Sequence, residues 1–289
     1  MTDPPTNDLD YEFDLPQEKL GGPPPEPENR ARPWIIGVVL VVAVALVGYL
    51  IVRNQPRDTA PIEDQAQLDV VPAAPEPNAL GGEPMLVVLP GLDLSDELVR
   101  ELVAGLSSHP RVAAWLATKG LIRTAAVVVT NIAEGHTPAV HLRRLRPTGD
   151  FRVTERNDTL HIDPRSYDRY TSLATAVASV DPGGAAELYA TLKPLFDEAS
   201  RDLGNGDAPF DRWLERAIVR LLDTPVLENS APVVPVKGVY AFGDPKVEAL
   251  SAAQKHLLRF GPSNVSLIQT TLRSIGVALG IPAAQLPPR

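Results

Sequence analysis

The feature that most constrains this chain is an uncharged apolar run of nineteen residues, Trp34–Val52 (WIIGVVLVVAVALVGYLIV). At a rise of about 1.5 Å per residue, a helix of this length measures about 28 Å, which matches the hydrocarbon thickness of a bilayer. Trp34 and Tyr49 lie near its two ends, where aromatic rings favour the membrane interface, and Arg32 and Arg53 flank it. The sequence therefore predicts a single-pass membrane protein, with the lipid bilayer as the partner of residues 34–52.

Two other interpretations of the run are less consistent with its surroundings. A buried core helix that is apolar all round needs apolar partners on every side, but proline-rich acidic segments flank this one. A cleaved signal peptide could use Ala43-Val44-Ala45 as its cleavage site. The 33-residue acidic leader, and the apolar run that continues past Ala45, argue against cleavage.

The orientation of the predicted span follows from the basic residues near it. Lys19, Arg30 and Arg32 precede the run, whereas Arg53 and Arg57 follow it. Because basic residues are enriched on the cytoplasmic side of membrane helices, this excess of one predicts a cytoplasmic N-terminus. The larger C-terminal part is then expected on the opposite side of the membrane.

The acidity of the chain is concentrated outside its predicted folded part. The formal net charge is −9, but residues 1–33 contain eight acids and three bases, and residues 53–84 contain six acids and two bases. We expect the first segment to be a disordered Pro-rich tail and the second to be a Pro/Ala-rich linker that spans about 30 Å. The remaining residues carry no net charge, so we expect no nucleic-acid partner. Cysteine is absent, which excludes disulfides and thiolate chemistry.

Residues 85–280 show the periodicity of a helical globular domain, and residues 281–289 are interpreted as a tail. Ser95 is a candidate N-cap of the first helix, which carries Leu98, Val99 and Leu102. Further helices are predicted at Pro110–Lys119, Leu121–Glu134, a segment from Pro182 onward, Phe210–Leu222, Pro245–Arg259 and Ser263–Leu279.

Three Asp-Pro pairs, Asp163-Pro164, Asp181-Pro182 and Asp244-Pro245, predict helix starts, because the carboxylate caps free N–H groups and proline has no N–H to leave unpaired. The residues of Phe151–Glu155 and Thr159–Ile162 alternate in character around a turn, which predicts a small β-hairpin. Val233–Tyr240 is interpreted as a short extended stretch. The predicted fold class is mainly α: a membrane helix, a spacer, and a helical domain with one hairpin.

The sequence lacks the common catalytic signatures, including a G-x-S-x-G elbow, S-x-x-K, H-E-x-x-H and a phosphate-binding loop that ends in Gly-Lys-Ser/Thr. Glu134, His136 and His141 come nearest to a metal-binding pattern, but two histidines five residues apart with a proline between them do not share a helical face. We therefore predict no metal site, no cofactor and no catalytic residue.

The segment from His141 to Tyr170 contains seven arginines. Guanidinium groups bind carboxylate and phosphate through paired hydrogen bonds, so Arg143, Arg165, Arg169 and Tyr170 form a candidate anion-binding surface. The alternative is an arginine-rich exterior that its own acids neutralise, because five acidic residues are interleaved with the arginines.

Several blocks of the folded part resemble a known family, and they are Leu121-Ile122-Arg123, Thr130-Asn131-Ile132, Leu145-Arg146-Pro147, Asp163–Tyr167, Val236–Tyr240 and Ala249–Asn264 (ALSAAQKHLLRFGPSN). In this order they resemble a bacterial family named as a domain of unknown function, number three thousand and fourteen, over about residues 84–280. The resemblance implies an N-terminal membrane helix, a proline-rich spacer and a location in the bacterial envelope. It implies no activity and no catalytic residues.

These observations favour a non-enzymatic envelope protein, anchored in the bacterial inner membrane, whose periplasmic domain binds or scaffolds another envelope protein or an envelope polymer. The alternative is a ligand-binding receptor or enzyme that uses the arginine/tyrosine surface. A third class, a purely structural spacer, would allow any folded domain of similar size to replace residues 85–289.

Overall fold

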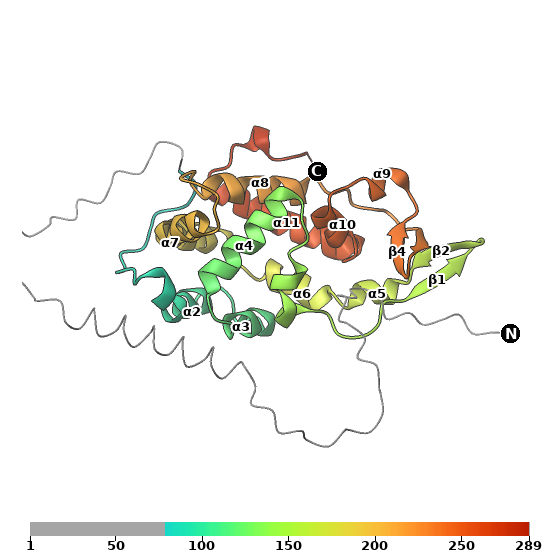
Figure 1. Ribbon diagram of the computed structural model, residues 1–289, viewed down its shortest axis with the longest axis horizontal. Coiled ribbons are helices and arrows are strands. Elements are labelled where there is room, and N and C mark those ends of the chain that lie inside the picture. The colour runs from blue at the N-terminus through green and yellow to red at the C-terminus, as the bar shows by residue number, and fades with distance from the viewer. Residues whose placement is uncertain (1–78, 289) are drawn as a thin grey trace, which may run out of the picture. The chain divides into compact units, whose positions relative to one another are not determined.

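The computed structural model describes residues 79–288, and Figure 1 shows their arrangement. The helices of this part are α2 (Asp96–Ala104), α3 (Pro110–Leu116), α4 (Leu121–Glu134), α5 (Pro164–Asp168), α6 (Thr171–Ala178), α7 (Pro182–Asp202), α8 (Asp211–Leu222), α9 (Pro245–Glu248), α10 (Ala252–Leu258) and α11 (Pro262–Ala278). The strands are β1 (Val153–Arg156), β2 (Thr159–Ile162), β3 (Val233–Val236) and β4 (Val239–Phe242). The prediction of a mainly helical fold is confirmed.

The three Asp-Pro pairs begin helices as predicted. The carboxylate of Asp163 accepts from the backbone N–H of Arg165 at the start of α5, and Asp181 caps α7 in the same manner through Gly184. Asp244 caps α9. These starts were predictable because both the cap and the proline act within one helical turn of the chain.

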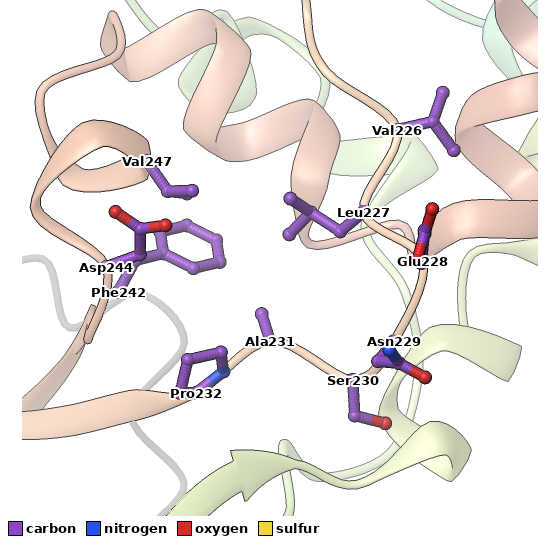
Figure 2. A pocket seen from close by; sticks show the side chains of 10 residues that line it. All are labelled: Val226, Leu227, Glu228, Asn229, Ser230, Ala231, Pro232, Phe242, Asp244 and Val247. Atoms are coloured by element: carbon purple, nitrogen blue, oxygen red, sulfur yellow. The ribbon is translucent and has the colours of Figure 1, made fainter.

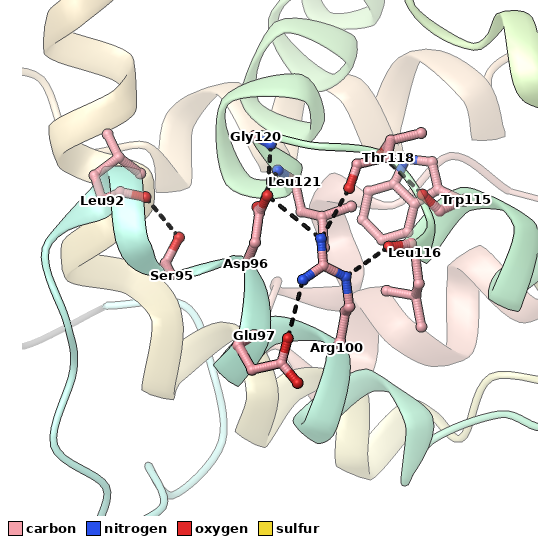
Figure 3. Close-up of polar contacts among 10 residues, drawn as sticks. All are labelled: Leu92, Ser95, Asp96, Glu97, Arg100, Trp115, Leu116, Thr118, Gly120 and Leu121. Atoms are coloured by element: carbon pink, nitrogen blue, oxygen red, sulfur yellow. Dashed lines mark hydrogen bonds and ion pairs between the residues drawn. The ribbon is translucent and has the colours of Figure 1, made fainter.

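The first helix is capped differently from the prediction. Ser95 is the residue before α2, but its hydroxyl donates to the carbonyl of Leu92 instead of accepting from the helix. The next residue, Asp96, accepts from the N–H groups of Gly120 and Leu121 at 2.9 and 2.8 Å, so a side chain of α2 caps the start of α4 (Figure 3).

Arg100, one turn further along α2, forms hydrogen bonds with carbonyl groups at the end of α3. Its Nε donates to the carbonyl of Leu116 and its Nη2 to the carbonyl of Thr118, at 2.9 and 3.1 Å (Figure 3). A carboxylate at the start of one helix and a guanidinium at the end of another both favour the helix dipoles. The pair therefore fixes the angle between α3 and α4.

The predicted helix over Pro245–Arg259 is divided in the structure. α9 ends at Glu248, and a new helix, α10, begins after Ser251 with a capping box in which Ser251 and Gln254 satisfy each other's backbone N–H groups. The Ser251 hydroxyl accepts a hydrogen bond from the backbone N–H of Gln254, so the serine acts as the N-cap of α10 and does not continue α9.

A second β-hairpin replaces the predicted single extended stretch, so the expectation of one hairpin was wrong. β3 and β4 pair antiparallel, with Val234 opposite Ala241 and Val236 opposite Val239. The turn residue Lys237 has a φ of 49° and Gly238 one of 84°. Both values are positive, as a two-residue hairpin turn requires.

The described residues bury three hydrophobic clusters. The largest joins α2, α3, α4, α7, α8 and α11, and the second lies between the hairpins, α9 and α10. The third joins α6, α10 and α11. In Figure 1 the hairpins and α9 lie at one end of this part of the chain, and α2, α3 and α7 lie at the other.

Residues on both sides of the expected 85–280 limits also pack into the largest cluster. Leu80, Ile281 and Leu286 are buried there. The chain enters along a short segment in which Gly81 N–H donates to the carbonyl of Leu279 and Gly82 N–H donates to the carbonyl of Ala186, each at 3.0 Å. Backbone hydrogen bonds thus hold the segment at residues 81–82 against α7 and the end of α11.

Among residues 79–288, no single helix is long and apolar enough to cross a bilayer. α3 and α4 reach that length and composition only together, and the chain bends by 110° between them. The predicted span Trp34–Val52, the acidic tail 1–33 and nearly all of the 53–84 linker lie outside the described residues, so these assignments stay predictions.

Candidate binding surface

The residues of the predicted anion-binding surface, Arg143, Arg165, Arg169 and Tyr170, lie in different surroundings in the structure. Arg165 pairs with Asp163, with its Nη2 2.5 Å from Oδ2 and its Nε 3.1 Å from both carboxylate oxygens. The hydrogen bond from Arg165 lowers the pKa of Asp163 despite the partial burial of this carboxyl. An anion that binds to Arg165 would have to compete with this carboxylate.

Arg169 and Tyr170 are brought together, but through packing. Arg169 donates to the carbonyls of Ser166 and Gly149, and its guanidinium lies 5.6 Å from the centre of the Tyr170 ring. The Tyr170 side chain is buried and stacks on Phe260, with 4.2 Å between ring centres. Arg143 is exposed on a short 3-10 helix, Arg143–Leu145. Anion binding by these residues stays a prediction.

Of the three residues that came nearest to a metal-binding pattern, only Glu134 and His136 lie close together. His136 Nδ1 lies 3.5 Å from a carboxylate oxygen of Glu134, and His141 lies on a separate 3-10 helix, Ala139–His141. Within residues 79–288, no group of three metal-ligating side chains gathers.

A pocket of about 340 Å³ opens beside the second hairpin, between the segment 226–232 and the start of α9. In Figure 2, Leu227, Ala231 and Phe242 point toward the space between them, and Val247 closes the side formed by α9. Polar residues of the 228–230 stretch, Glu-Asn-Ser, complete the lining. An apolar floor with a few polar groups at its edge is typical of a binding site.

The segment 226–232 is held in place at Ala231, whose backbone N–H and carbonyl both form hydrogen bonds. Its N–H donates to the hydroxyl of Tyr167 at 3.2 Å, and its carbonyl accepts from Ile162 N–H at 2.9 Å. Burial raises the pKa of Tyr167, so its hydroxyl keeps its proton. The floor of the pocket is therefore preformed by the junction of the two hairpins.

Side chains from α9 and from the end of α10 form hydrogen bonds with the backbone of the second hairpin. Glu248 of α9 accepts from Phe242 N–H at 2.8 Å, and Arg259 donates to the carbonyl of Tyr240 at 2.8 Å. Burial alone would raise the pKa of Glu248, but hydrogen bonds from Lys255 and from Phe242 N–H outweigh it and lower the pKa. The Arg259 guanidinium also lies 5.3 Å from the centre of the Phe242 ring. These contacts hold the hairpin from one side.

The opposite face of the hairpin is apolar and exposed. Directly opposed residues of an antiparallel pair project to the same side, so the register places Val234, Val236, Val239 and Ala241 together on one face. Val234, Val236 and Val239 are 45, 43 and 46% exposed, and Val226 at the edge of the pocket is 44% exposed. The pocket lies on the other face of the strands, where Phe242 lines it. We call the three exposed valines of the strands, Val234, Val236 and Val239, the hairpin surface.

The pocket on the other face of the strands contains two acidic residues, Asp244 and Glu228. Of its acidic groups, Asp244 already accepts from Lys246 N–H at 2.8 Å, and Glu228 is exposed. Among the pocket-lining residues there is no histidine, lysine or tyrosine to act as a base. This site was not predicted from the sequence, although apolar residues at both odd and even positions of Val233–Phe242 were a signal for it.

Comparison with known proteins places this geometry in a family. No curated protein matches the chain, and no solved structure matches it. The family described as Protein of unknown function (DUF3014) matches residues 121–276, which include the resembling blocks from Leu121 to Asn264, both hairpins and every residue that lines the pocket beside the second hairpin. Because this match covers more than half of the chain, the protein belongs to the DUF3014 family.

Proposed function

We propose that this DUF3014 protein is a membrane-anchored, non-enzymatic binding protein of the bacterial envelope. Its apolar run Trp34–Val52 anchors it, residues 53–78 act as a spacer, and the helical domain binds a partner through the hairpin surface. A short spacer keeps such a domain at a high effective concentration near other components of the same membrane.

The observation that carries the proposal is the exposed valine face of the second hairpin. Single exposed apolar residues are normal in soluble proteins, but a contiguous exposed group marks an interaction site. Val234, Val236 and Val239 form such a group, and the clamp from Glu248 and Arg259 limits the entropy that a partner would have to remove. Valines at the surface and an apolar pocket floor favour a protein partner over a carbohydrate polymer.

The N-terminal approach of the domain supports a tethering role. Leu80 is buried and its N–H donates to Asp211, and Met85 N–H donates to the hydroxyl of Thr191. A force transmitted through residues 53–78 would therefore act on α7 and α8 at several points. Within the described residues, the hairpins lie at the end opposite α2, α3 and α7 (Figure 1).

The experiment is site-specific photo-crosslinking of the full chain in intact bacterial membranes. A photoreactive phenylalanine analogue replaces Val236 in one variant and Val277 in the other, because Val277 is also an exposed valine (59%) but lies on α11. The proposal expects a discrete adduct of reproducible mass from position 236, lost when Val234 and Val239 are changed to lysine, and none from position 277. Equal labelling from both positions, or none from either under several growth conditions, would refute it.

Membrane anchorage is tested separately, with the same full chain. Recovery of the protein in the detergent-rich phase after phase separation is expected, together with a reporter that is active in the cytoplasm when it is fused at the N-terminus. Soluble recovery of the uncleaved chain would overturn the anchor without affecting the result for the hairpin surface.

A further inference from the structure

At the opposite end of the described chain lies a second cavity, of about 280 Å³, that has no part in the hairpin surface. It is enclosed by parts of α2, α3, α4, α7, α8 and α11 and is partly open. Its walls include Val103, Trp115, Ala125, Ala185 and Leu192, and seventeen of the eighteen lining residues are apolar or aromatic.

The lining offers almost nothing to a polar ligand or to water. The polar exceptions are Ser107, whose hydroxyl lies 2.7 Å from that of Ser179, and the hydroxyl of Tyr189, which donates to Asp211. A buried water needs two to four polar partners, and an apolar cavity of about 150 Å³ stays dry and accepts a hydrocarbon such as benzene. A cavity of 280 Å³ is large enough for a longer hydrocarbon segment.

The place where the chain enters the domain indicates the source of that hydrocarbon. Leu80 is packed in the hydrophobic cluster that surrounds the cavity, and Gly81 N–H donates to the carbonyl of Leu279, a residue of the cavity wall. The 26 residues between the predicted membrane helix and Ala79 would span about 28 Å as a flexible coil. A domain tethered by a linker of this length would stay within reach of bilayer lipids.

We infer that this cavity binds a single acyl chain of a membrane lipid or lipid-like molecule, with the polar headgroup left outside. The inference rests on the proposed membrane anchorage for its source of lipid, and it is independent of the hairpin surface. Binding would fill apolar space between α2, α3 and α7 that the protein's own side chains leave open.

The test uses the purified full chain in lipid nanodiscs that contain a palmitate analogue with a photoreactive group in the middle of its chain. After illumination and trypsin digestion, adducts are expected on the peptide of residues 112–119, which carries Trp115, and excess unlabelled palmitate should reduce them at least tenfold. Ala125→Leu fills the cavity and should reduce the adducts to a similar extent. Ala113→Leu on the exposed side of α3 is the matched control and should leave them unchanged.

A second pair of variants keeps the test informative if Ala125→Leu unfolds. Val103→Thr preserves the volume of the wall but adds a hydroxyl, and should weaken labelling several-fold, whereas Val277→Thr at an exposed site should not. Labelling that is absent, that does not compete with palmitate, or that persists in both cavity variants would overturn the inference.

The outcomes also separate the two proposals. A chain that enters nanodiscs but shows no cavity adduct leaves the anchor intact and removes the acyl site. If the chain stays soluble, palmitate analogue added to that same soluble chain should still give the adduct on residues 112–119. In that case the acyl site stands while the anchor fails.

Discussion

Asp211 connects the N-terminal approach of the domain to its core, and its removal is expected to destabilise the protein strongly. Its Oδ1 accepts from the Tyr189 hydroxyl at 2.5 Å and lies 2.6 Å from Lys193 Nζ, and its Oδ2 accepts from Leu80 N–H at 3.1 Å. The side chains of Asp211 and Lys193 are only 14 and 22% exposed. Burial and the neighbouring Asp211 carboxylate raise the pKa of Tyr189, so Tyr189 stays a neutral donor.

The expected size of the effect follows from what Asp211→Ala leaves behind. Removal of one partner of a buried ion pair costs about 3–5 kcal/mol, because the other charge stays buried without compensation. The Nζ atom of Lys193 is itself buried, so water does not solvate that charge, and we expect a loss of about 3–5 kcal/mol in the free energy of unfolding. For a domain of roughly 200 residues this corresponds to a fall in Tm of about 6–20 °C.

Thermal unfolding of the full chain in mild detergent, followed by far-ultraviolet circular dichroism, measures the effect. Asp207→Ala, which removes an exposed aspartate from the preceding loop, is the matched control and should leave Tm unchanged. Lys193→Met in the Asp211→Ala background removes the stranded ammonium and should recover at least half of the loss. A fall of less than 1 °C for Asp211→Ala, or no recovery in the double variant, would show that the charge pair does not hold this junction.

Three further predictions follow from local geometry. Gly261→Ala should lower the free energy of unfolding, measured by urea titration, by about 3 kcal/mol or more, because φ is +85° and the new Cβ would overlap the Tyr167 side chain. Gly280→Ala, with a φ of +86° and open space around it, should cost about 1–2 kcal/mol in the same titration, and equal losses would contradict the packing argument. Burial, aided by the charge of Arg259, lowers the pKa of His256 from 6.5 to about 4, so its contribution to stability is complete above pH 6.5 and disappears as the pH falls to 4. The stability difference between the native chain and His256→Gln should therefore shrink by about 3 kcal/mol between pH 6.5 and 4, and a constant difference would mean that His256 titrates normally. Arg169→Ala should lower Tm by several degrees, because the variant loses the hydrogen bonds to the carbonyls of Ser166 and Gly149, while Arg165→Ala should change Tm little. If inorganic phosphate raises the Tm of the native chain but not that of a variant that carries both Arg165→Ala and Arg169→Ala, these arginines form the anion site of the alternative hypothesis.

Much of the helical framework could be predicted because its signals are local. The Asp163, Asp181 and Asp244 caps and the end of α4 at Gly135 depend on residues within one or two turns of each other, so the local sequence contains the interactions involved. The first hairpin was found for the same reason, since its alternation and its turn lie within twelve residues.

The errors arose where a side chain had a choice of partners. Asp96 caps a helix that begins 25 residues later, and the Ser95 hydroxyl turns back to Leu92, which no local pattern reveals. Pro235 weakened the evidence for a strand in the second hairpin, because proline cannot donate to a ladder, and Lys237-Gly238 is a less common turn than Asn-Gly.

The sequence by itself determined the helical class, the capped helix starts and the family, because periodicity, caps and the order of short motifs along the chain can all be read without knowledge of tertiary contacts. Only the tertiary structure decided which apolar residues are buried. Val233 and Phe242 face the interior, whereas Val234 and Val239 on the same strands face outward, and hydropathy alone cannot distinguish the two faces of a strand that is apolar on both. Likewise, only the fold showed that Arg165 is already paired with Asp163, because an ion pair depends on side-chain geometry that composition does not contain.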